Sequence, residues 1–499
     1  MDTAKNIRSA HSLNGSLPAT DSFRFHSIAA ALEHHAATQA DAPYLISVDE
    51  HGGRNEYTYG RFRENVLRCA SNLHEHGVRR GTRIVSAAHN HEDTVILLFA
   101  AWCIGACVVP LNMTEDDDRL RFIIGDCDAV LAVVRPDYDE RVRPMCADVG
   151  LRCVTVDDPQ YVVSSTTSLY TCADDSFLDE ECLIVYTSGT TGKPKGVVLV
   201  QRNLMADGEG IAAWHGIDPG QRMMCVLPIH HVNGTIVTLV TPFLAGSSVV
   251  VLRRFRSETF FTTIRREGVT VTSVVPTLLA FLLEAKSDDC DVLLHGFRHI
   301  ICGAGPLTCE LADRFESAYR IPIMHGYGLS ETTCYSCFIE TSLSSTEHRH
   351  WMQDYGFPSI GTPIPQNEMR IHDGSGNSCA ENVRGEIVIR GWNVMKEYYN
   401  NGPANASAFE HGWFRSGDEG FWVSSPAGKP YFFITGRLKE LIIRGGVNIA
   451  PLEIDEVINR APGVRAGISV GFDNDFYGEE VGALVVSDGS CDAEAVKEF

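Results

Sequence analysis

The amino-acid sequence predicts an α/β protein with a large N-terminal domain of parallel α/β sheets, a β-rich subdomain and a small α+β C-terminal domain. From about residue 80 to 330, short runs rich in β-branched residues alternate with longer helix-like segments. This alternation is typical of parallel sheets that are covered on both faces. From about residue 369, strand-like runs are separated by turn residues with little helix, and the chain ends on a helix-strand-strand pattern.

Domain boundaries follow from these changes of pattern. A chain of 499 residues is too long for one hydrophobic core. We expect a disordered lead-in over residues 1–24 and a large domain over 25–435, in which the β-rich subdomain occupies about 369–435. A partial α+β domain is expected over 436–499.

The predicted elements follow one another in that order. In the first region a helix, EDTVILLFAAWCIGA at 92–106, follows the first predicted strand. The strands there are RIVSAA (83–88), AVLAVV (129–134), LRCVTV (151–156), CLIVY (182–186), MMCVLP (223–228), SVVVL (248–252), VTVTSVV (269–275) and RHIIC (298–302). In the second region they are MRIHD (369–373), GEIVIRG (385–391), YFFITG (431–436) and ELIIRGG (440–446), and the last unit holds a helix from 451 and strands near 466–472 and 481–487.

Composition excludes several classes of partner. The formal net charge is −22 and the pI is about 5.3, so the surface repels nucleic acid and anionic membranes. No apolar run approaches the roughly 20 residues of a membrane span, and the N-terminus lacks the apolar stretch of a secretory signal. The 16 cysteines are scattered, which favours free thiols in a reducing cytoplasm. Cys334 and Cys337 form a lone CxxC pair without the second pair that a zinc site needs.

The run YTSGTTGKPKG, Tyr186–Gly196, follows the predicted strand CLIVY directly. Its glycines expose backbone N–H groups, its hydroxyls add donors, and Lys193 and Lys195 add positive charge, which suits a polyphosphate. The spacing does not match a Walker A loop. On composition alone, a plain surface turn explains the run equally well.

The order of residues decides between these interpretations. YTSGTTGKPKGV resembles the phosphate-binding signature of the adenylate-forming superfamily, which includes acyl-CoA synthetases. The resemblance extends from about residue 25 to 499 through LPIHHVNG, CGAGPL, HGYGLSETT, GWFRSGDEG and GRLKELIIRGGVNI. It implies an ATP-dependent carboxylic acid:CoA ligase that uses ATP, Mg²⁺ and CoA. An acyl-adenylate forms with release of pyrophosphate, the small mobile C-terminal domain rotates, and a thiol then displaces AMP.

The resemblance also assigns roles to individual residues. Lys195, Glu331 and Lys439 are expected to be catalytic, with Glu331 as the Mg²⁺ ligand and Lys439 at the interdomain hinge. The expected ATP-binding residues are Thr187, Ser188, Gly189, Thr190, Thr191, Gly192, Lys195, Gly303, Ala304, Gly305, Pro306, Tyr327, Gly328, Ser330, Asp418 and Arg437. The expected acyl-pocket residues are His231, Val232, Cys302, Gly303, Gly326 and Cys334.

Two departures from the family pattern qualify these expectations. Leu227–Gly234 contains no aspartate, which disfavours an α-amino acid because its buried ammonium would lack a partner. Relatives also carry a lysine near the C-terminus that contacts substrate and ATP, and the chain ends before that segment. Lys497 is not a substitute, because no such motif surrounds it. We therefore expect a truncated chain with impaired adenylation.

Three alternatives to a CoA ligase stay open at this point. A stand-alone adenylating enzyme would pass the acyl group to a carrier-protein thiol or to an amine. A non-catalytic nucleotide-binding relative would explain the absent lysine, and luciferase activity is a remote third alternative. The motifs do not identify the acid beyond an aliphatic or aromatic one. They also leave the oligomeric state open.

Overall fold

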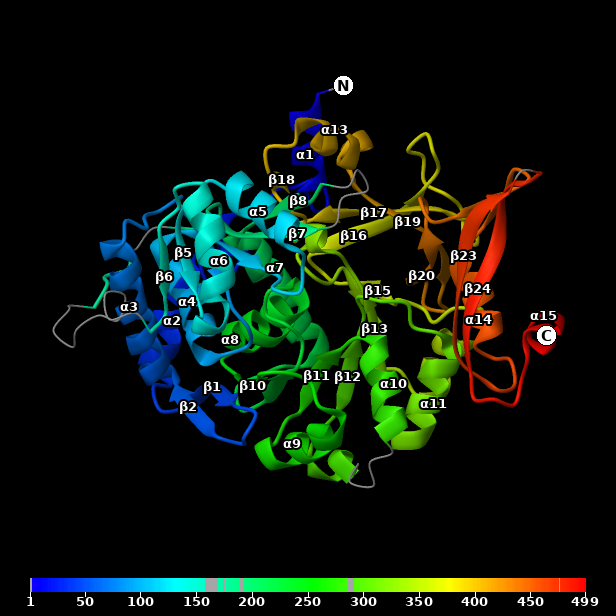
Figure 1. The fold of residues 1–499 in the computed structure, drawn as a ribbon, viewed down its shortest axis with the longest axis horizontal. Coiled ribbons are helices and arrows are strands. Elements are labelled where there is room, and N and C mark those ends of the chain that lie inside the picture. Colours follow the sequence, from blue (N-terminus) through cyan, green and yellow to red (C-terminus); the bar gives the residue numbers. More distant parts are fainter. Residues whose placement is uncertain (1, 158–168, 174–175, 188–192, 286–290, 475) are drawn as a thin grey trace.

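Two large sheets dominate the computed structural model, with two smaller sheets along one side (Figure 1). The structure describes residues 2–157, 169–173, 176–187, 193–285, 291–474 and 476–499. Both large sheets are parallel in their centres and carry antiparallel strands at an edge. The predicted α/β class is therefore confirmed.

The larger sheet has nine strands, and six of them form its parallel centre. The central strands are buried and rich in β-branched residues, as a sheet covered on both faces requires. In spatial order the strands are β15 (Thr362–Pro363), β14 (Cys337–Phe338), β13 (Ile323–Tyr327), β12 (His299–Cys302), β11 (Val271–Val274), β9 (Arg222–Cys225), β10 (Ser248–Leu252), β1 (Pro43–Val48) and β2 (Arg54–Thr58).

The second sheet has seven strands, and its antiparallel edge carries the glycine- and hydroxyl-rich signature. In spatial order the strands are β18 (Glu397–Tyr398), β8 (Lys195–Val200), β7 (Glu181–Thr187), β4 (Cys107–Leu111), β3 (Arg83–Ala87), β5 (Ala129–Val134) and β6 (Cys153–Thr155). β18 comes from a segment about 200 residues later in the chain than β8, so it ties the β-rich region to the signature strand.

Helices pack between the two large sheets and around them (Figure 1). α4 (Glu92–Ile104) contacts β1 of one sheet and β4 of the other, which explains why twelve of its thirteen residues are buried and why it has no polar face. The other helices are α2 (Ile28–Thr38), α3 (Tyr59–Glu75), α5 (Asp117–Asp126), α6 (Pro136–Asp148), α7 (Gln201–His215), α8 (Thr241–Leu244), α9 (Phe260–Glu267), α10 (Pro276–Ala285), α11 (Cys309–Tyr319), α12 (Ser345–Gln353) and α13 (Gly402–Ala408), with short turns η1 (Thr20–Ser22), η3 (Ser257–Thr259), η4 (Asp291–His295), η5 (Ser330–Thr332) and η6 (Glu410–Gly412). Within the described ranges, no helix combines the length and the apolar character needed to cross a bilayer.

The two smaller sheets are antiparallel. One consists of β16 (Asn367–His372), β17 (Gly385–Gly391), β19 (Phe414–Ser424) and β20 (Pro430–Arg437). The other consists of β22 (Val447–Ile449), β21 (Ile442–Arg444), β24 (Gly478–Ser487) and β23 (Val464–Asn474), with helices α14 (Pro451–Ile458) and α15 (Ala493–Glu498). Figure 1 shows β23 and β24 at the outer edge of the molecule. The β21–β22 hairpin turns through Gly445 and Gly446, whose φ angles of 58° and 84° suit a two-residue turn.

The N-terminal segment differs from the expected disordered lead-in. Thr3–Ala10 forms helix α1, and the Asp2 side chain accepts a hydrogen bond from the backbone N–H of Lys5 at its start. α1 contacts β17 and η6, and the backbone carbonyl of Met395 lies 2.8 Å from Nε2 of His11. Local N-capping and a contact distant in sequence therefore order this segment. The sequence pattern did not reveal the distant contact.

Candidate active site

The glycine- and hydroxyl-rich signature starts in β7 and finishes in β8, which pair as an antiparallel β-hairpin. Thr187 pairs with Lys195 across the two strand ends. The predicted residues Ser188, Gly189, Thr190, Thr191 and Gly192 lie outside the described residues. At the end of the hairpin, Nζ of Lys195 lies 5.1 Å from the centroid of the Tyr398 ring, within the range of a cation–π contact.

Two further motifs meet because their strands are neighbours. β12 and β13 are parallel and adjacent, so Cys302–Pro306 and Tyr327–Glu331 leave the sheet at the same edge. Ligands bind at such carboxyl ends of strands in open α/β sheets. Gly303 is needed here, because an added Cβ would lie 2.6 Å from the carbonyl oxygen of Gly326. Ala304 adopts a φ of 61°, an uncommon conformation for a residue with a side chain.

Glu331, the predicted Mg²⁺ ligand, lies in the short turn η5 after β13. Its Oε1 accepts a hydrogen bond of 2.8 Å from the hydroxyl of Tyr398. Burial raises the pKa of Glu331, while the Tyr398 hydroxyl, Arg437 and Lys195 favour its ionised form. The ionised carboxylate is therefore short of stabilising charge, which a cation would supply. Ser330 lies half-buried beside it.

The turn that presents Glu331 has a strained backbone that a hydrogen bond and close packing hold in place. Thr333 has φ 67° and ψ −56°, a costly conformation for a β-branched residue. Its hydroxyl donates to the carbonyl oxygen of Asn393 at 2.6 Å, which holds it there. A Cβ added to Gly328 would lie 1.9 Å from the carbonyl oxygen of Cys334, so only glycine fits.

Two of the predicted ATP-binding residues, Tyr327 and Asp418, contact each other. The hydroxyl of Tyr327 donates to Oδ2 of Asp418 at 2.6 Å, and both side chains are buried. Burial raises the pKa of Asp418 to about 6. Arg437 pairs with Asp418 across β19 and β20, and its Nε lies 3.4 Å from Oδ1. The sequence did not predict the link between Tyr327 and Asp418.

The predicted acyl-pocket residues divide into buried and exposed ones. Val232, Cys302 and Cys334 are buried, whereas His231 is exposed to solvent. Asn233–Val240 follows as η2, a π-helix, a form that is frequent at functional sites. Gly326 packs against Phe338, where an added Cβ would lie 2.4 Å from the ring.

Lys439, the predicted hinge, lies in the turn between β20 and β21, two residues after Arg437. Both side chains are exposed. The sequence did not mark Tyr398, Asn233 or Tyr335 as site residues. The structure places Tyr398 against Glu331 and Tyr335 against Gly303, and Asn233 donates to the Tyr335 hydroxyl. The run KEYYNN, which contains Tyr398, has no spacing that indicates a function.

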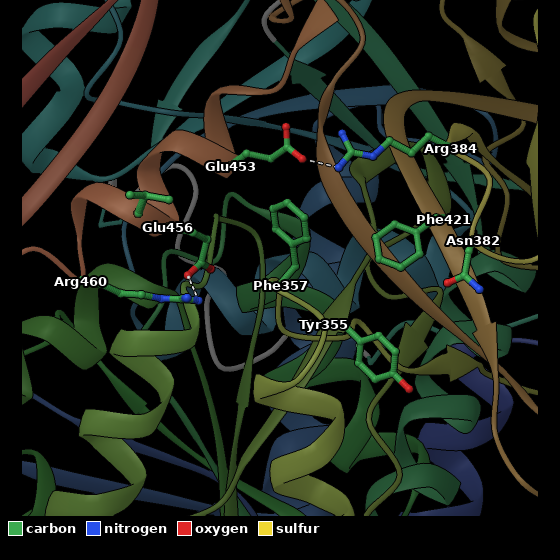
Figure 2. Close-up of a pocket in the computed structure, with 10 residues that line it drawn as sticks. Tyr355, Phe357, Asn382, Arg384, Phe421, Glu453, Glu456 and Arg460 are labelled. Atoms are coloured by element: carbon green, nitrogen blue, oxygen red, sulfur yellow. Dashed lines mark hydrogen bonds and ion pairs between the residues drawn. The ribbon is translucent and has the colours of Figure 1, made fainter. Parts of the chain in front are cut away.

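A cavity of about 500 Å³ lies apart from all of these residues, between α14 and the rest of the molecule (Figure 2). Its charged groups are paired, Arg384 with Glu453 and Arg460 with Glu456. The carboxylate of Glu456 also accepts from the backbone N–H of Cys309, and burial raises its pKa to about 7. The lining residues are Tyr355, Gly356, Phe357, Asn382, Arg384, Phe421, Glu453, Glu456, Val457 and Arg460. The cavity therefore lies where α14, part of the C-terminal segment 436–499 (here the small unit), meets the rest of the molecule.

Known proteins resemble the chain along most of its length. Residues 32–399 match the model of the AMP-binding enzyme family. The sulfoacetate–CoA ligase of Cupriavidus necator is 33% identical over 93% of this chain and 88% of its own length. The oxalate–CoA ligase of Arabidopsis thaliana is 29% identical over 87% and 84%.

Solved structures agree with these sequence matches. ATP-bound MatB from Rhodopseudomonas palustris superposes with a TM-score of 0.81 at 25% identity, over 94% of this chain and 91% of that one. The o-succinylbenzoate CoA synthetase MenE of Bacillus subtilis, in complex with its acyl-adenylate, gives 0.80 at 26% identity, over the same shares of the two chains. Together with the motifs described above, these matches show an ATP-dependent carboxylic acid:CoA ligase of the adenylate-forming superfamily. The chain belongs to the family of AMP-binding enzymes.

Proposed function

We propose that this ligase activates a short carboxylic acid without an α-amino group. The observation that carries this proposal is a buried polar cluster beneath the end of β12. Nδ2 of Asn233 donates to the Tyr335 hydroxyl at 3.2 Å, and the Ser273 hydroxyl donates to Oδ1 of Asn233 at 2.7 Å. A Cβ added to Gly303 would lie 2.7 Å from the Tyr335 oxygen. These side chains fill space that a long acyl chain would need.

Two further observations support this substrate class, one for the length of the acid and one for the missing α-amino group. The relatives named for sulfoacetate and oxalate act on short acids. Leu227–Gly234 offers no carboxylate for an α-ammonium group, which would be costly to bury alone.

In the first half-reaction, the acid attacks the α-phosphate of ATP and pyrophosphate leaves. Such a step needs positioning and charge neutralisation more than a protein nucleophile. Thr187, Lys195 and Ser330 would hold the phosphates, while Tyr327 and Asp418 would hold the adenosine. Glu331 would hold Mg²⁺, which supplies positive charge to phosphate oxygens when it is bound.

In the second half-reaction, the CoA thiol displaces AMP after the small unit has turned. Lys439 would absorb the backbone change, because it lies in the turn that connects β20 to the small sheet. The glycine turn at Gly445 would then approach the acceptor's path. We place the reaction in the cytoplasm, since every cysteine that the structure describes is a free thiol, as a reducing compartment favours.

Acid-dependent exchange of pyrophosphate into ATP tests this proposal. The panel holds short acids with and without a second anionic group, medium and long fatty acids, aromatic acids and α-amino acids. We expect exchange with a short acid and none with long or α-amino acids, and thioester formation when CoA is added. Exchange with long acids would overturn the proposed substrate class. A thioester with a carrier protein but not with CoA would overturn the proposed acceptor.

Tyr335 provides a direct check on the pocket. Tyr335→Ala should open the space beneath Gly303 and shift the preference towards longer acids by about tenfold, roughly the effect of one or two methylenes in a pocket. Tyr335→Phe keeps the ring and removes the hydroxyl, so it should retain the preference for length. An unchanged preference in Tyr335→Ala would contradict a pocket bounded by this ring.

A further inference from the structure

Tyr398 contacts both Glu331 and Lys195, two charged residues that bind the phosphates of ATP and their Mg²⁺ in the proposed function. Its hydroxyl donates to Oε1 of Glu331 at 2.8 Å, and its ring lies 5.1 Å from Nζ of Lys195. The side chain is only 8% exposed. One tyrosine therefore contacts the proposed Mg²⁺ ligand with its oxygen and the signature lysine with its ring.

The backbone on either side of Tyr398 makes the same connection. The N–H of Met395 donates to the carbonyl oxygen of Glu331 at 2.7 Å. The N–H groups of Lys396 and Tyr399 donate to the carbonyl oxygens of Val198 and Gly196 at 2.9 and 2.7 Å. The segment 395–399 is thus hydrogen-bonded to the Glu331 turn on one side and to β8, which begins at Lys195, on the other.

This arrangement restricts what Tyr398 can contribute. A tyrosine that only filled space would not need its hydroxyl aimed at a half-buried carboxylate. A hydrogen bond to a charged group is about twice as strong as one between neutral groups, and it fixes the orientation of the acceptor. A carboxylate fixed through one oxygen presents its other oxygen in a defined direction, as the outer partners of metal ligands do.

We propose that Tyr398 is a positioning residue that orients Glu331 for the divalent cation and couples it to Lys195. The proposal rests on the proposed role of Glu331 as the Mg²⁺ ligand. Tyr398 itself would touch neither the cation nor the reacting atoms. Its loss should therefore weaken the contribution of the metal to ATP binding more than it weakens the binding of metal-free ATP.

Calorimetric titration of ATP into the protein tests this directly. The Kd is measured once in EDTA and once in excess Mg²⁺, and the EDTA value divided by the Mg²⁺ value measures the contribution of the metal. We expect Tyr398→Phe, which keeps the ring, to lower that ratio by about tenfold, the lower end of the effect of losing an outer partner of a metal ligand. Pyrophosphate exchange should require more Mg²⁺ in the same variant.

Tyr399→Phe is the matched control. Tyr399 is adjacent and its hydroxyl also donates to a carboxylate, Asp128, at 2.5 Å, at an exposed site. This variant should keep the wild-type ratio. An unchanged ratio in Tyr398→Phe would overturn the proposal, as would an equal fall in both variants.

Glu331→Gln serves as a second variant should Tyr398→Phe fail to fold. The amide oxygen of the introduced glutamine can still accept a hydrogen bond from the Tyr398 hydroxyl. The orientation of the side chain is therefore kept while its charge is lost. A wild-type ratio in Glu331→Gln would show that Tyr398 orients nothing that the metal uses. A different failure is also recognisable: if Mg²⁺ does not alter ATP binding in the wild-type protein, the proposed metal site itself is wrong.

Discussion

The residues proposed to bind ATP and the small C-terminal sheet are built in opposite ways. Tyr327 and Asp418 are 7% and 3% exposed and are hydrogen-bonded to each other. On the small sheet, Ile468 and Leu484 face each other across β23 and β24, yet they are 54% and 66% exposed. The first region is desolvated and tightly packed, whereas the second leaves apolar side chains in water.

The contacts that hold the two regions differ as well. β18 and β19 join the residues proposed to bind ATP to neighbouring strands, so these residues cannot shift without breaking a sheet. α14 of the small unit contacts the rest through Glu453 and Glu456, which accept from Arg384 and from the N–H of Cys309. Polar contacts of this kind can be exchanged for others at a modest cost. The comparison supports the proposal of a fixed site for adenylation beside a small unit that reorients.

Loss of the charge on Glu331 should give the largest effect. Glu331→Gln should lower the rate of pyrophosphate exchange about 10²–10³-fold, because it removes a fixed charge from a half-buried site. Glu397→Gln, on the same β18 segment as Tyr398, is the control and should keep the wild-type rate. If both variants were equally active, the fixed region would not be the site of adenylation.

Asp418 should give the next largest effect. Asp418→Asn keeps an acceptor for the Tyr327 hydroxyl but loses the charge, so the KM for ATP should rise about 10- to 100-fold, the range expected for loss of a charged hydrogen bond. Glu368→Gln, whose carboxylate accepts from Arg390 across β16 and β17 of the same sheet, is the control for steady-state kinetics. An equal rise of the KM in both variants would indicate a general weakening of the sheet and not the loss of a contact with the adenosine of ATP.

The same substitution should stabilise the fold at neutral pH. Burial raises the pKa of Asp418 from 3.8 to about 6. Between these values the folded state binds more protons than the unfolded one, so stability falls as pH rises through this window. The cost, about 3 kcal/mol at most, is fully present above pH 6. Thermal unfolding should show Asp418→Asn melting above the wild type at pH 7.5, with the gap closing towards pH 4. A gap independent of pH would mean that Asp418 is not the titrating group.

For the region proposed to bind ATP, the sequence could predict part of the strand arrangement but not the side-chain hydrogen bonds. The apolar run ending at Cys302 predicted one strand of a parallel sheet. No run was predicted for the neighbouring strand β13, which ends at Tyr327, and the pairing of β12 with β13 brings the motifs after them together. The bond from Tyr398 to Glu331 joins residues 67 positions apart, and the second partner lies in a two-residue strand. No periodicity or motif marks so short a strand. The side-chain contacts of the site therefore required the structure.

A substitution in the glycine turn of the small sheet should have a smaller effect, and it should affect the two half-reactions differently. Gly446 has φ 84° and nothing lies within 4 Å of an added Cβ, so Gly446→Ala costs only backbone strain, about 1 kcal/mol. We expect CoA-thioester formation to fall several-fold while pyrophosphate exchange stays within about twofold of the wild type. Gly428→Ala, at φ 77° in the turn between β19 and β20, is matched in strain and openness. A slower exchange reaction in Gly446→Ala alone would mean that the small sheet also serves adenylation.

The exposed ion pair between Arg384 and Glu453 should give the smallest effect. Both side chains are 40% exposed, and such surface pairs contribute about 0–1 kcal/mol. Arg384→Ala should therefore change the melting temperature by about 1–2 °C and leave both half-reactions within about twofold of the wild type. Arg349→Ala, which loses an exposed pair with Asp313 on the large region, is the control. A selective loss of thioester formation in Arg384→Ala would show that the small unit must occupy this orientation during the second half-reaction. The contrast between a fixed region and an exchangeable one would then have to be replaced by two fixed orientations of the small unit.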